Sequence, residues 1–140
     1  MRGYRPEDLG FLWDMLYETA FWRPDATRPP RAEALSGSAL ARYPEGFGRP
    51  GDAAVVAVVA MDPAGGARVG AAWYRLMTEE EPGYGFVDPG VPELSIGVAV
   101  QARGRGVGSG LLAALLGRAE DDGFGALSLS VEDGNPALRL

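Results

Sequence analysis

The stretch between residues 93 and 116 constrains the fold more than any other part of this sequence. Its first positions, 93–100, are mostly apolar and predict a buried strand. The next positions, 101–110, are rich in arginine and glycine, and the apolar residues after them recur at helical spacing. A strand therefore leads through a tight turn directly into an amphipathic helix, and that helix needs a sheet to pack against.

The rest of the chain supplies further helices and strands in an order typical of an α+β fold. From the N-terminus we expect a helix that starts at Pro6 and ends before Pro24, a weaker helix at 32–42, a hairpin with strands at 53–61 and 67–78, an acidic loop at 79–92, the unit just described, a strand at 126–132, and a further helix start at Asn135–Pro136. The sequence thus predicts one domain, residues 1–140, built on a mixed, mostly antiparallel sheet flanked by helices.

Three residue types are absent, and their absence excludes whole classes of chemistry. The chain has no cysteine and no histidine, and all 13 of its basic residues are arginine. Thiol nucleophiles, Ser-His-Asp triads, thiolate and imidazole metal sites, lysine Schiff bases and P-loops are therefore excluded. Carboxylates, hydroxyls, arginines and backbone amides remain for chemistry, and we expect no bound metal.

Charge and hydropathy narrow the range of partners. The formal net charge of −6 argues against nucleic acid, because binding it needs an extended basic surface. The longest apolar run, residues 53–61, is far shorter than the roughly 20 residues of a membrane-spanning helix. No apolar segment typical of a signal peptide follows Met1. We therefore expect a cytoplasmic protein that contacts neither nucleic acid nor a membrane.

The glycine-rich turn has the properties of a phosphate site. Glycine lets the backbone approach a ligand closely, and the first turn of a helix offers unpaired N–H groups at the positive end of its dipole. Arg103 and Arg105 add positive charge. The glycine spacing of Rossmann folds is not met, because its third glycine falls on Ser109 or Leu111. The pattern Gln/Arg-x-x-Gly-x-Gly/Ala is met twice, from Gln101 and from Arg103.

This pattern, placed between a strand and a helix with an Asn-Pro pair downstream, resembles the GNAT superfamily of acyl-CoA N-acyltransferases. The match is carried by residues 93–116 and reaches the end of the chain, whereas the N-terminal two-thirds agrees in element order only. The resemblance implies that acetyl-CoA donates an acetyl group to the primary amine of a small molecule or peptide, by direct attack of the amine. It also implies a set of residues that hold the cofactor: Val98, Val100, Arg103, Gly104, Arg105, Gly106, Val107, Gly108, Ser109 and Asn135.

Candidate catalytic and acceptor-binding residues follow from the resemblance and from the residue types available. Glu93, at the start of the strand that leads to the turn, is the candidate general base; the alternative is a solvent-facing carboxylate at a strand end. Ser95 and Tyr84 are rival polar groups. Phe21 and Trp22, where the first helix ends, are candidates for the wall of the acceptor site, and the alternative for both is core packing.

The resemblance also implies parts that this sequence does not contain. Family members continue past the Asn-Pro pair through a full helix, often with a tyrosine that protonates the leaving thiolate, and two more strands. We therefore expect an acyl-CoA N-acyltransferase-like fold that lacks the last helix and strands, with an unpaired edge at 126–132 through which two copies can form a homodimer. This expectation keeps open a catalytically silent CoA-binding or oligomerisation module. A purely structural turn and a phosphate ligand other than CoA are the remaining alternatives.

Overall fold

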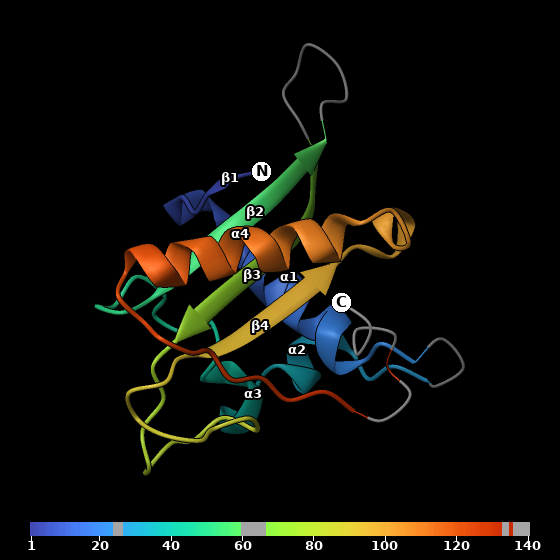
Figure 1. Ribbon diagram of the computed structural model, residues 1–140. Coiled ribbons are helices and arrows are strands. Elements are labelled where there is room, and N and C mark those ends of the chain that lie inside the picture. The colour runs from blue at the N-terminus through green and yellow to red at the C-terminus, as the bar shows by residue number, and fades with distance from the viewer. Residues whose placement is uncertain (24–26, 60–66, 133–134, 136–140) are drawn as a thin grey trace.

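Figure 1 shows the computed structural model of the chain, which describes residues 1–23, 27–59, 67–132 and 135. Four strands form one sheet in the order β1-β2-β3-β4, and each neighbouring pair is antiparallel. The strands are β1 (Arg2–Gly3), β2 (Ala53–Val59), β3 (Ala67–Arg75) and β4 (Glu93–Val98). The helices are α1 (Leu9–Ala20), α2 (Arg31–Ala34), α3 (Ser38–Ala41) and α4 (Val107–Asp121), with the 3₁₀ helices η1 (Pro6–Asp8) and η2 (Val100–Ala102).

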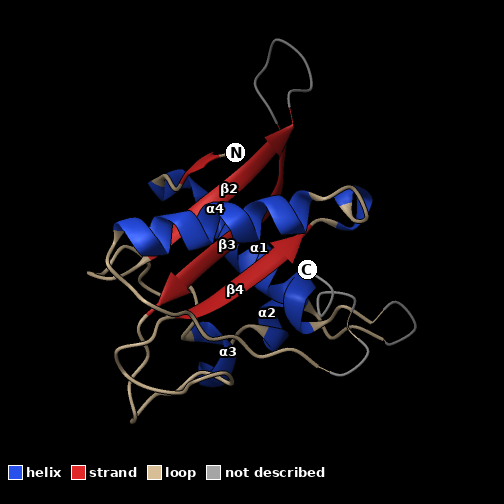
Figure 2. Cartoon of the chain, in the orientation of Figure 1, coloured by secondary structure: helices blue, strands red, loops and turns tan. Residues whose placement is uncertain are grey.

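The sheet lies between two helices, with α4 on one face and α1 on the other (Figures 1 and 2). Because side chains alternate between the two faces of a strand, β2 and β3 each contribute to two cores. The core beneath α1 includes Leu12, Leu16 and Trp73, none more than 3% exposed. The core beneath α4 includes Leu111 and Leu115, both 0% exposed. The apolar side chains of β4 pack into the core beneath α4.

Two glycines let the helices approach the sheet closely. A Cβ at Gly97 of β4 would lie 2.7 Å from the backbone oxygen of Met15 in α1. A Cβ at Gly70 of β3 would lie 2.9 Å from Leu111 Cδ1 in α4. A larger residue at either position would therefore push a helix away from the sheet.

The α+β fold expected from the sequence is confirmed, and most elements lie where the sequence places them. The helix expected from Pro6 begins as η1, continues as α1 and ends at Ala20. The strands expected at 53–61, 67–78 and 93–100 are present over shorter ranges, as β2, β3 and β4. β2 and β3 pair as the predicted hairpin, whose turn falls outside the described residues. The short β1 was not predicted, because two residues carry no periodic pattern.

The weaker helix expected at 32–42 is broken into α2 and α3. Ser36 ends the first turn, because its hydroxyl and its N–H both donate to the carbonyl oxygen of Glu33, at 2.8 and 3.4 Å. Leu35, at the break, turns into the core and is 7% exposed. Two single turns thus replace one continuous helix, and the chain after them reaches the core at Tyr43.

The prediction of a strand at 126–132 is wrong. Within this range Ser128 forms an isolated bridge, parallel to Glu93, and the neighbouring residues are not in a strand. The bridge is made by hydrogen bonds from Leu94 N–H to Ser128 O at 2.7 Å and from Ser128 N–H to Pro92 O at 2.9 Å. The sheet is therefore mixed at this one position and antiparallel elsewhere among the described residues.

Parallel pairing stops at Ser128, and the next outward-facing carbonyl groups of β4 accept hydrogen bonds from side chains. The oxygen of Ile96 accepts the Thr19 hydroxyl at 2.7 Å. The oxygen of Val98 accepts Arg103 Nε–H at 3.0 Å. The open edge of the described sheet is therefore the far half of β4.

Candidate functional site

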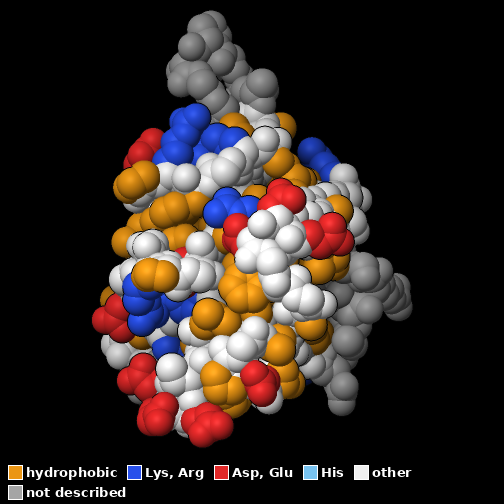
Figure 3. All heavy atoms as spheres, turned by 60° about the vertical axis from the view of Figure 1, so that its left-hand side comes forward, with side chains coloured by type: hydrophobic (Ala, Val, Ile, Leu, Met, Phe, Trp, Pro, Cys, Tyr) orange, Lys and Arg blue, Asp and Glu red, His pale blue; other side chains and the backbone are white. Residues whose placement is uncertain are grey.

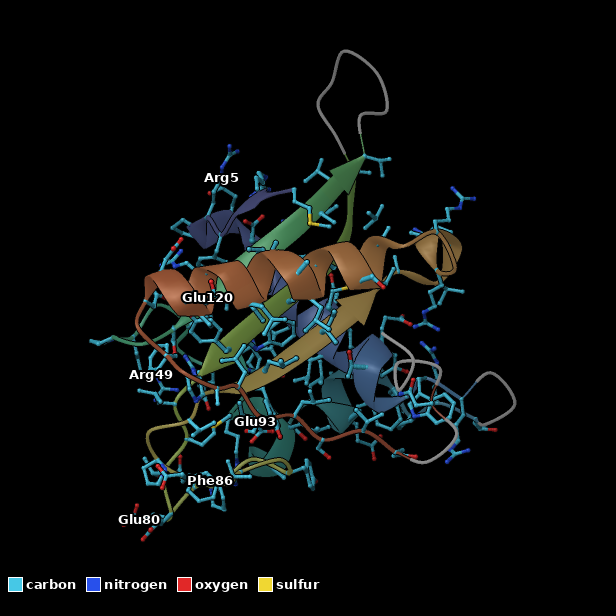
Figure 4. The ribbon with its side chains drawn as sticks, viewed as in Figure 1. Arg5, Arg49, Glu80, Phe86, Glu93 and Glu120 are labelled. Carbon is cyan, nitrogen blue, oxygen red and sulfur yellow. The ribbon has the colours of Figure 1, made fainter. Side chains whose placement is uncertain are left out.

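The two ends of β4 lie apart and carry different kinds of group. The amino end starts at Glu93, beside the C-terminal segment and close to the loop that carries Phe86 (Figure 4). The carboxyl end leads through η2 and the glycine-rich turn at 103–106 into α4 (Figure 1). The strand has six residues and is therefore roughly 20 Å long.

The outer edge of β4 has unpaired backbone donors. In an antiparallel pair, alternate residues direct their backbone groups toward the partner strand or away from it. Ala99 N–H donates to β3 at 2.8 Å, so Leu94, Ile96 and Val98 direct their groups outward. The N–H groups of Ile96 and Val98 have no acceptor among the residues that the structure describes. This edge can therefore pair with the amides of an extended ligand.

The glycine-rich turn holds its backbone in a conformation that glycine favours. Gly104 and Gly106 have φ angles of +75° and +80°, and a Cβ at either position would meet no atom within 4 Å. Gly106 caps α4, whose first bond runs from Gly110 N–H to Gly106 O at 3.0 Å. Within the described part of the chain, no backbone N–H from Gly104 to Ser109 has an acceptor. Successive free donors at a helix N-terminus form a site for an anion such as phosphate.

The two arginines of the turn are placed differently. Arg103 folds back along β4, where its Nε–H donates to Val98 O at 3.0 Å and its guanidinium pairs with Glu18 of α1 at 3.2 Å. Arg105 is exposed and has no partner in the described ranges. Of the two, Arg105 is free to meet an anion at the turn, whereas Arg103 covers part of the outer edge of β4.

Glu93 is 2% exposed, so the alternative of a solvent-facing carboxylate at the strand end is wrong. Its Oε2 accepts a hydrogen bond from the Tyr43 hydroxyl and another from Gly85 N–H at 3.2 Å. Its Oε1 is also buried and has no hydrogen-bond partner among the described residues. A Cβ at Gly83 would collide with Oε1, so the loop before β4 packs directly over the carboxylate. One buried carboxylate oxygen is therefore left to accept a proton.

Sequence reasoning did not single out Tyr43, which the structure brings to Glu93. The Tyr43 hydroxyl accepts Tyr84 N–H at 2.7 Å, and its backbone carbonyl accepts the Trp73 indole N–H at 3.2 Å. Burial, and then the hydrogen bond to Glu93, raise the pKa of Tyr43 well above its ordinary value, so the hydroxyl keeps its proton and donates. No local pattern could have found this contact, because the two residues lie 50 positions apart.

The two rival polar residues and the acidic run also lie near the amino end of β4. Ser95 is 8% exposed, whereas the side chain of Tyr84 is 68% exposed and only its backbone joins the cluster around Glu93. The glutamates at 79–81 are exposed. Figure 4 shows Glu80 at the lower tip of the molecule, and Figure 3 shows acidic side chains gathered at that end of one face. A positively charged molecule is attracted to this end.

Phe21 and Trp22, which follow α1, line a pocket of about 250 Å³ together with Arg23 and Glu132. Arg23 lies over the Trp22 ring at 4.6 Å and pairs with Glu132 at 3.0 Å. Asn135 donates its N–H to the carbonyl oxygen of Glu132 at 3.2 Å, and Pro136 lies outside the described residues. Phe21, Trp22 and Glu132 thus meet at one pocket.

A further pocket, of about 290 Å³, contains none of the candidate residues; it is lined by Arg42, Glu45, Gly46, Arg49 and Glu81. Among the described helices, none has both the length and the apolar character needed to cross a bilayer. In the same described ranges, no three acidic side chains come together in a way that could hold a metal ion.

Residues 13–140 match the sequence model of a family described as "Acetyltransferase (GNAT) family". No curated protein matches the sequence significantly. Among solved structures, the fold is similar to that of a ribosomal-protein-alanine N-acetyltransferase from Brucella melitensis, with a TM-score of 0.62, 24% identity, and coverage of 99% of this chain and 77% of that one.

Two further structures show the same similarity. An N-acetyltransferase from Staphylococcus aureus Mu50 has a TM-score of 0.61 and 19% identity, over 99% of this chain and 76% of that one. A GNAT superfamily phosphinothricin acetyltransferase from Sinorhizobium meliloti, in complex with AcCoA, has a TM-score of 0.50 and 25% identity, over 88% of this chain and 60% of that one.

Proposed function

This chain belongs to the acetyltransferase (GNAT) family, and we propose that it transfers an acetyl group from acetyl-CoA to a primary amine. The observation that carries the proposal is the series of unpartnered backbone N–H groups from Gly104 to Ser109 in the described chain. These donors suit the pyrophosphate of CoA, and the exposed Arg105 adds positive charge beside them. The likeness to a structure that holds AcCoA supports the same donor.

In this proposal the pantetheine arm lies along the open edge of β4. The unpartnered N–H groups of Ile96 and Val98 support this placement, because pantetheine amides can pair with a strand edge as a further strand does. An amide of the ligand then replaces Arg103 as the donor to Val98 O. Val100, which is 57% exposed in η2, and Asn135 are the proposed flanking contacts.

The proposed chemistry is direct attack of the amine on the thioester. The neutral amine adds to the thioester carbonyl and forms the C–N bond, and the C–S bond then breaks; the chain has no cysteine, histidine or lysine to form an acyl-enzyme. The acceptor first loses its ammonium proton to Glu93, directly or through a water, so that the amine is free to attack. As the amide forms, the nitrogen loses a second proton to solvent, and the CoA thiolate takes a proton from solvent. An outward-facing N–H of β4 stabilises the oxyanion that develops on the thioester carbonyl.

The proposed acceptor is a small-molecule or peptide amine. Primary amines are cationic in neutral water, and the exposed glutamates at 79–81 attract a cation toward the amino end of β4. The rings of Phe21 and Trp22 supply an apolar wall at their pocket. Both features favour an acceptor that combines a positive charge with apolar surface.

The test is to incubate the protein with acetyl-CoA and a panel of primary amines while following the release of free thiol. The panel includes aliphatic diamines, aromatic amines and short peptides with free N-termini. We expect thiol release with at least one amine, together with a mass increase of one acetyl group on that amine. Acetyl-CoA binding without thiol release for any amine would contradict the transferase.

A catalytically silent CoA-binding or oligomerisation module is the second candidate, and one observation favours it. Glu93 is 2% exposed and lies beneath Gly83, so an acceptor reaches it only through a water or after the loop moves. Such a module binds acetyl-CoA at the turn and leaves every amine unchanged. The same incubation separates the two candidates.

A further inference from the structure

Glu93 lies in a buried polar cluster drawn from three segments, of which the one with Tyr43 is far from the other two in the sequence. Tyr43 comes from the turn after α3, Tyr84 and Gly85 come from the loop between β3 and β4, and Glu93 is the first residue of β4. A buried carboxylate is costly unless hydrogen bonds satisfy it. In this cluster the hydrogen bonds are not shared evenly between the two carboxylate oxygens.

The donors converge on one oxygen of Glu93. The Tyr43 hydroxyl and Gly85 N–H both donate to Oε2. Tyr84 N–H donates to the oxygen of the Tyr43 hydroxyl at 2.7 Å, and this contact directs the hydroxyl proton toward Glu93. Oε1 is buried without a partner among the described residues, under a glycine whose Cβ would occupy the same space. The two oxygens of one carboxylate therefore differ in what they can still accept.

We propose that Tyr43 is a positioning residue that holds Oε2 of Glu93 and leaves Oε1 as the atom that takes the amine proton. The assignment rests on the proposed acetyl transfer, since it gives an atom to the proton-removal step. The proton leaves the ammonium of the acceptor before the C–N bond forms, ends on Oε1 and is later returned to solvent. Tyr43 donates its hydrogen bond throughout and neither gains nor loses a proton.

The other charged and titratable groups around Glu93 are paired elsewhere or exposed. They are Arg75 of β3, which pairs with Asp52 at 2.6 Å; Arg42, which donates to the carbonyl oxygen of Pro82; and the exposed Tyr84 phenol and glutamates 79–81. The segment 127–131, beside Glu93, has no ionisable side chain. The Tyr43 hydroxyl is therefore the side chain that acts most directly on the protonation of Glu93.

The test is the carbon NMR signal of the Glu93 side-chain carboxyl at neutral pH, assigned with Glu93→Gln, in the wild type, Tyr43→Phe and Tyr74→Phe. The Tyr74 hydroxyl donates to Asp122 on the α4 face, so Tyr74→Phe removes a tyrosine–carboxylate bond elsewhere. In Tyr43→Phe we expect the carboxyl signal to move, because Oε2 loses a hydrogen-bond donor. In Tyr74→Phe the signal should match the wild type. An unmoved signal in folded Tyr43→Phe would overturn the proposal.

A pH–rate profile gives the second readout. The acidic limb of kcat should move to higher pH in Tyr43→Phe, while the KM for acetyl-CoA stays as in the wild type. If the wild type turns over no amine, the proposed function fails, while the carboxyl signal of Glu93 still decides the role of Tyr43. If Tyr43→Phe does not fold, the wild type itself is decisive. Its Tyr43 hydroxyl proton should give a downfield signal protected from exchange, and the absence of that signal would overturn the proposal.

Discussion

At its carboxyl end β4 leads into backbone N–H groups with no acceptor among the described residues, whereas at its amino end it begins with a carboxylate that is 2% exposed. The carboxyl end is made by one contiguous stretch of chain, through the positive φ angles of Gly104 and Gly106. The amino end is made by side chains and amides from three separate segments. One strand thus has unpartnered backbone donors at one end and a buried carboxylate at the other. In the proposed function the first end binds the cofactor and the second takes a proton, so changes at one end should leave the other intact.

The largest expected effect comes from Glu93→Gln, which tests the amino end alone. In the proposed mechanism this change removes the base and keeps the shape of the side chain, so kcat should fall at least about 100-fold. The affinity for acetyl-CoA, measured by calorimetry, should stay within about twofold of the wild type. Glu120→Gln, an exposed change near the end of α4, is the control and should leave both quantities unaltered. A full kcat in Glu93→Gln would return Glu93 to a structural role.

Gly83→Ala tests how tightly the amino end is packed. The new Cβ would collide with Glu93 Oε1, so we expect the free energy of unfolding to fall by about 1–3 kcal/mol. Urea denaturation measures this change. Gly125→Ala is the matched control, because a Cβ there meets no atom within 4 Å, and it should change stability by less than about 0.5 kcal/mol. Equal stability of the two variants would mean that the loop does not rest on the carboxylate.

Gly108→Asp tests whether acetyl-CoA binds at the carboxyl end of β4. The aspartate places a negative charge in the first turn of α4, where it favours the helix but repels the proposed pyrophosphate. We expect acetyl-CoA to bind at least about tenfold more weakly, or about 1.4 kcal/mol. Gly117→Asp adds the same charge at an exposed position further along α4 and should leave the affinity unchanged. Calorimetry on both folded variants decides whether the turn is the binding site.

The smallest effect is expected for Arg105→Gln. Because Arg105 is exposed, its attraction for the proposed phosphate is weakened by solvent, and we expect a loss of affinity of about threefold. Salt should reduce this difference, since screening acts on exposed charges. Calorimetry at low and high salt measures it, and a difference that is independent of salt would argue against a direct charge contact.

The carboxyl end of β4 could be predicted from the sequence because its strand, glycines and helix follow one another without interruption. The pattern from Arg103 to Gly108 fixes a turn, and a turn positions backbone donors whatever the rest of the chain does. The amino end could not be predicted beyond Glu93 itself. Tyr43 and Gly85 reach Glu93 only through the folded arrangement of the sheet and its loops, and neither position carries a periodic signal.

The prediction of a strand at 126–132 failed for a related reason. Alternating apolar residues such as Leu127, Leu129 and Val131 suit a strand, but a strand also has to lie alongside a partner over its whole length. The segment at 127–131 pairs with β4 at Ser128 alone, and a local pattern cannot reveal how far two segments run side by side. The alternation of apolar residues therefore did not suffice to predict a strand here.

The central claim is that acetyl-CoA binds at the carboxyl end of β4 and leaves the amino end unchanged. The most direct test is an NMR titration of the backbone amides of the labelled protein with acetyl-CoA. The account predicts that the N–H signals from Gly104 to Ser109 move most, that those of Ile96 and Val98 follow, and that Tyr84 and Gly85 at the amino end hardly change. Unmoved signals from Gly104 to Ser109 in a protein that binds acetyl-CoA, with the changes gathered at Tyr84 and Gly85, would contradict it.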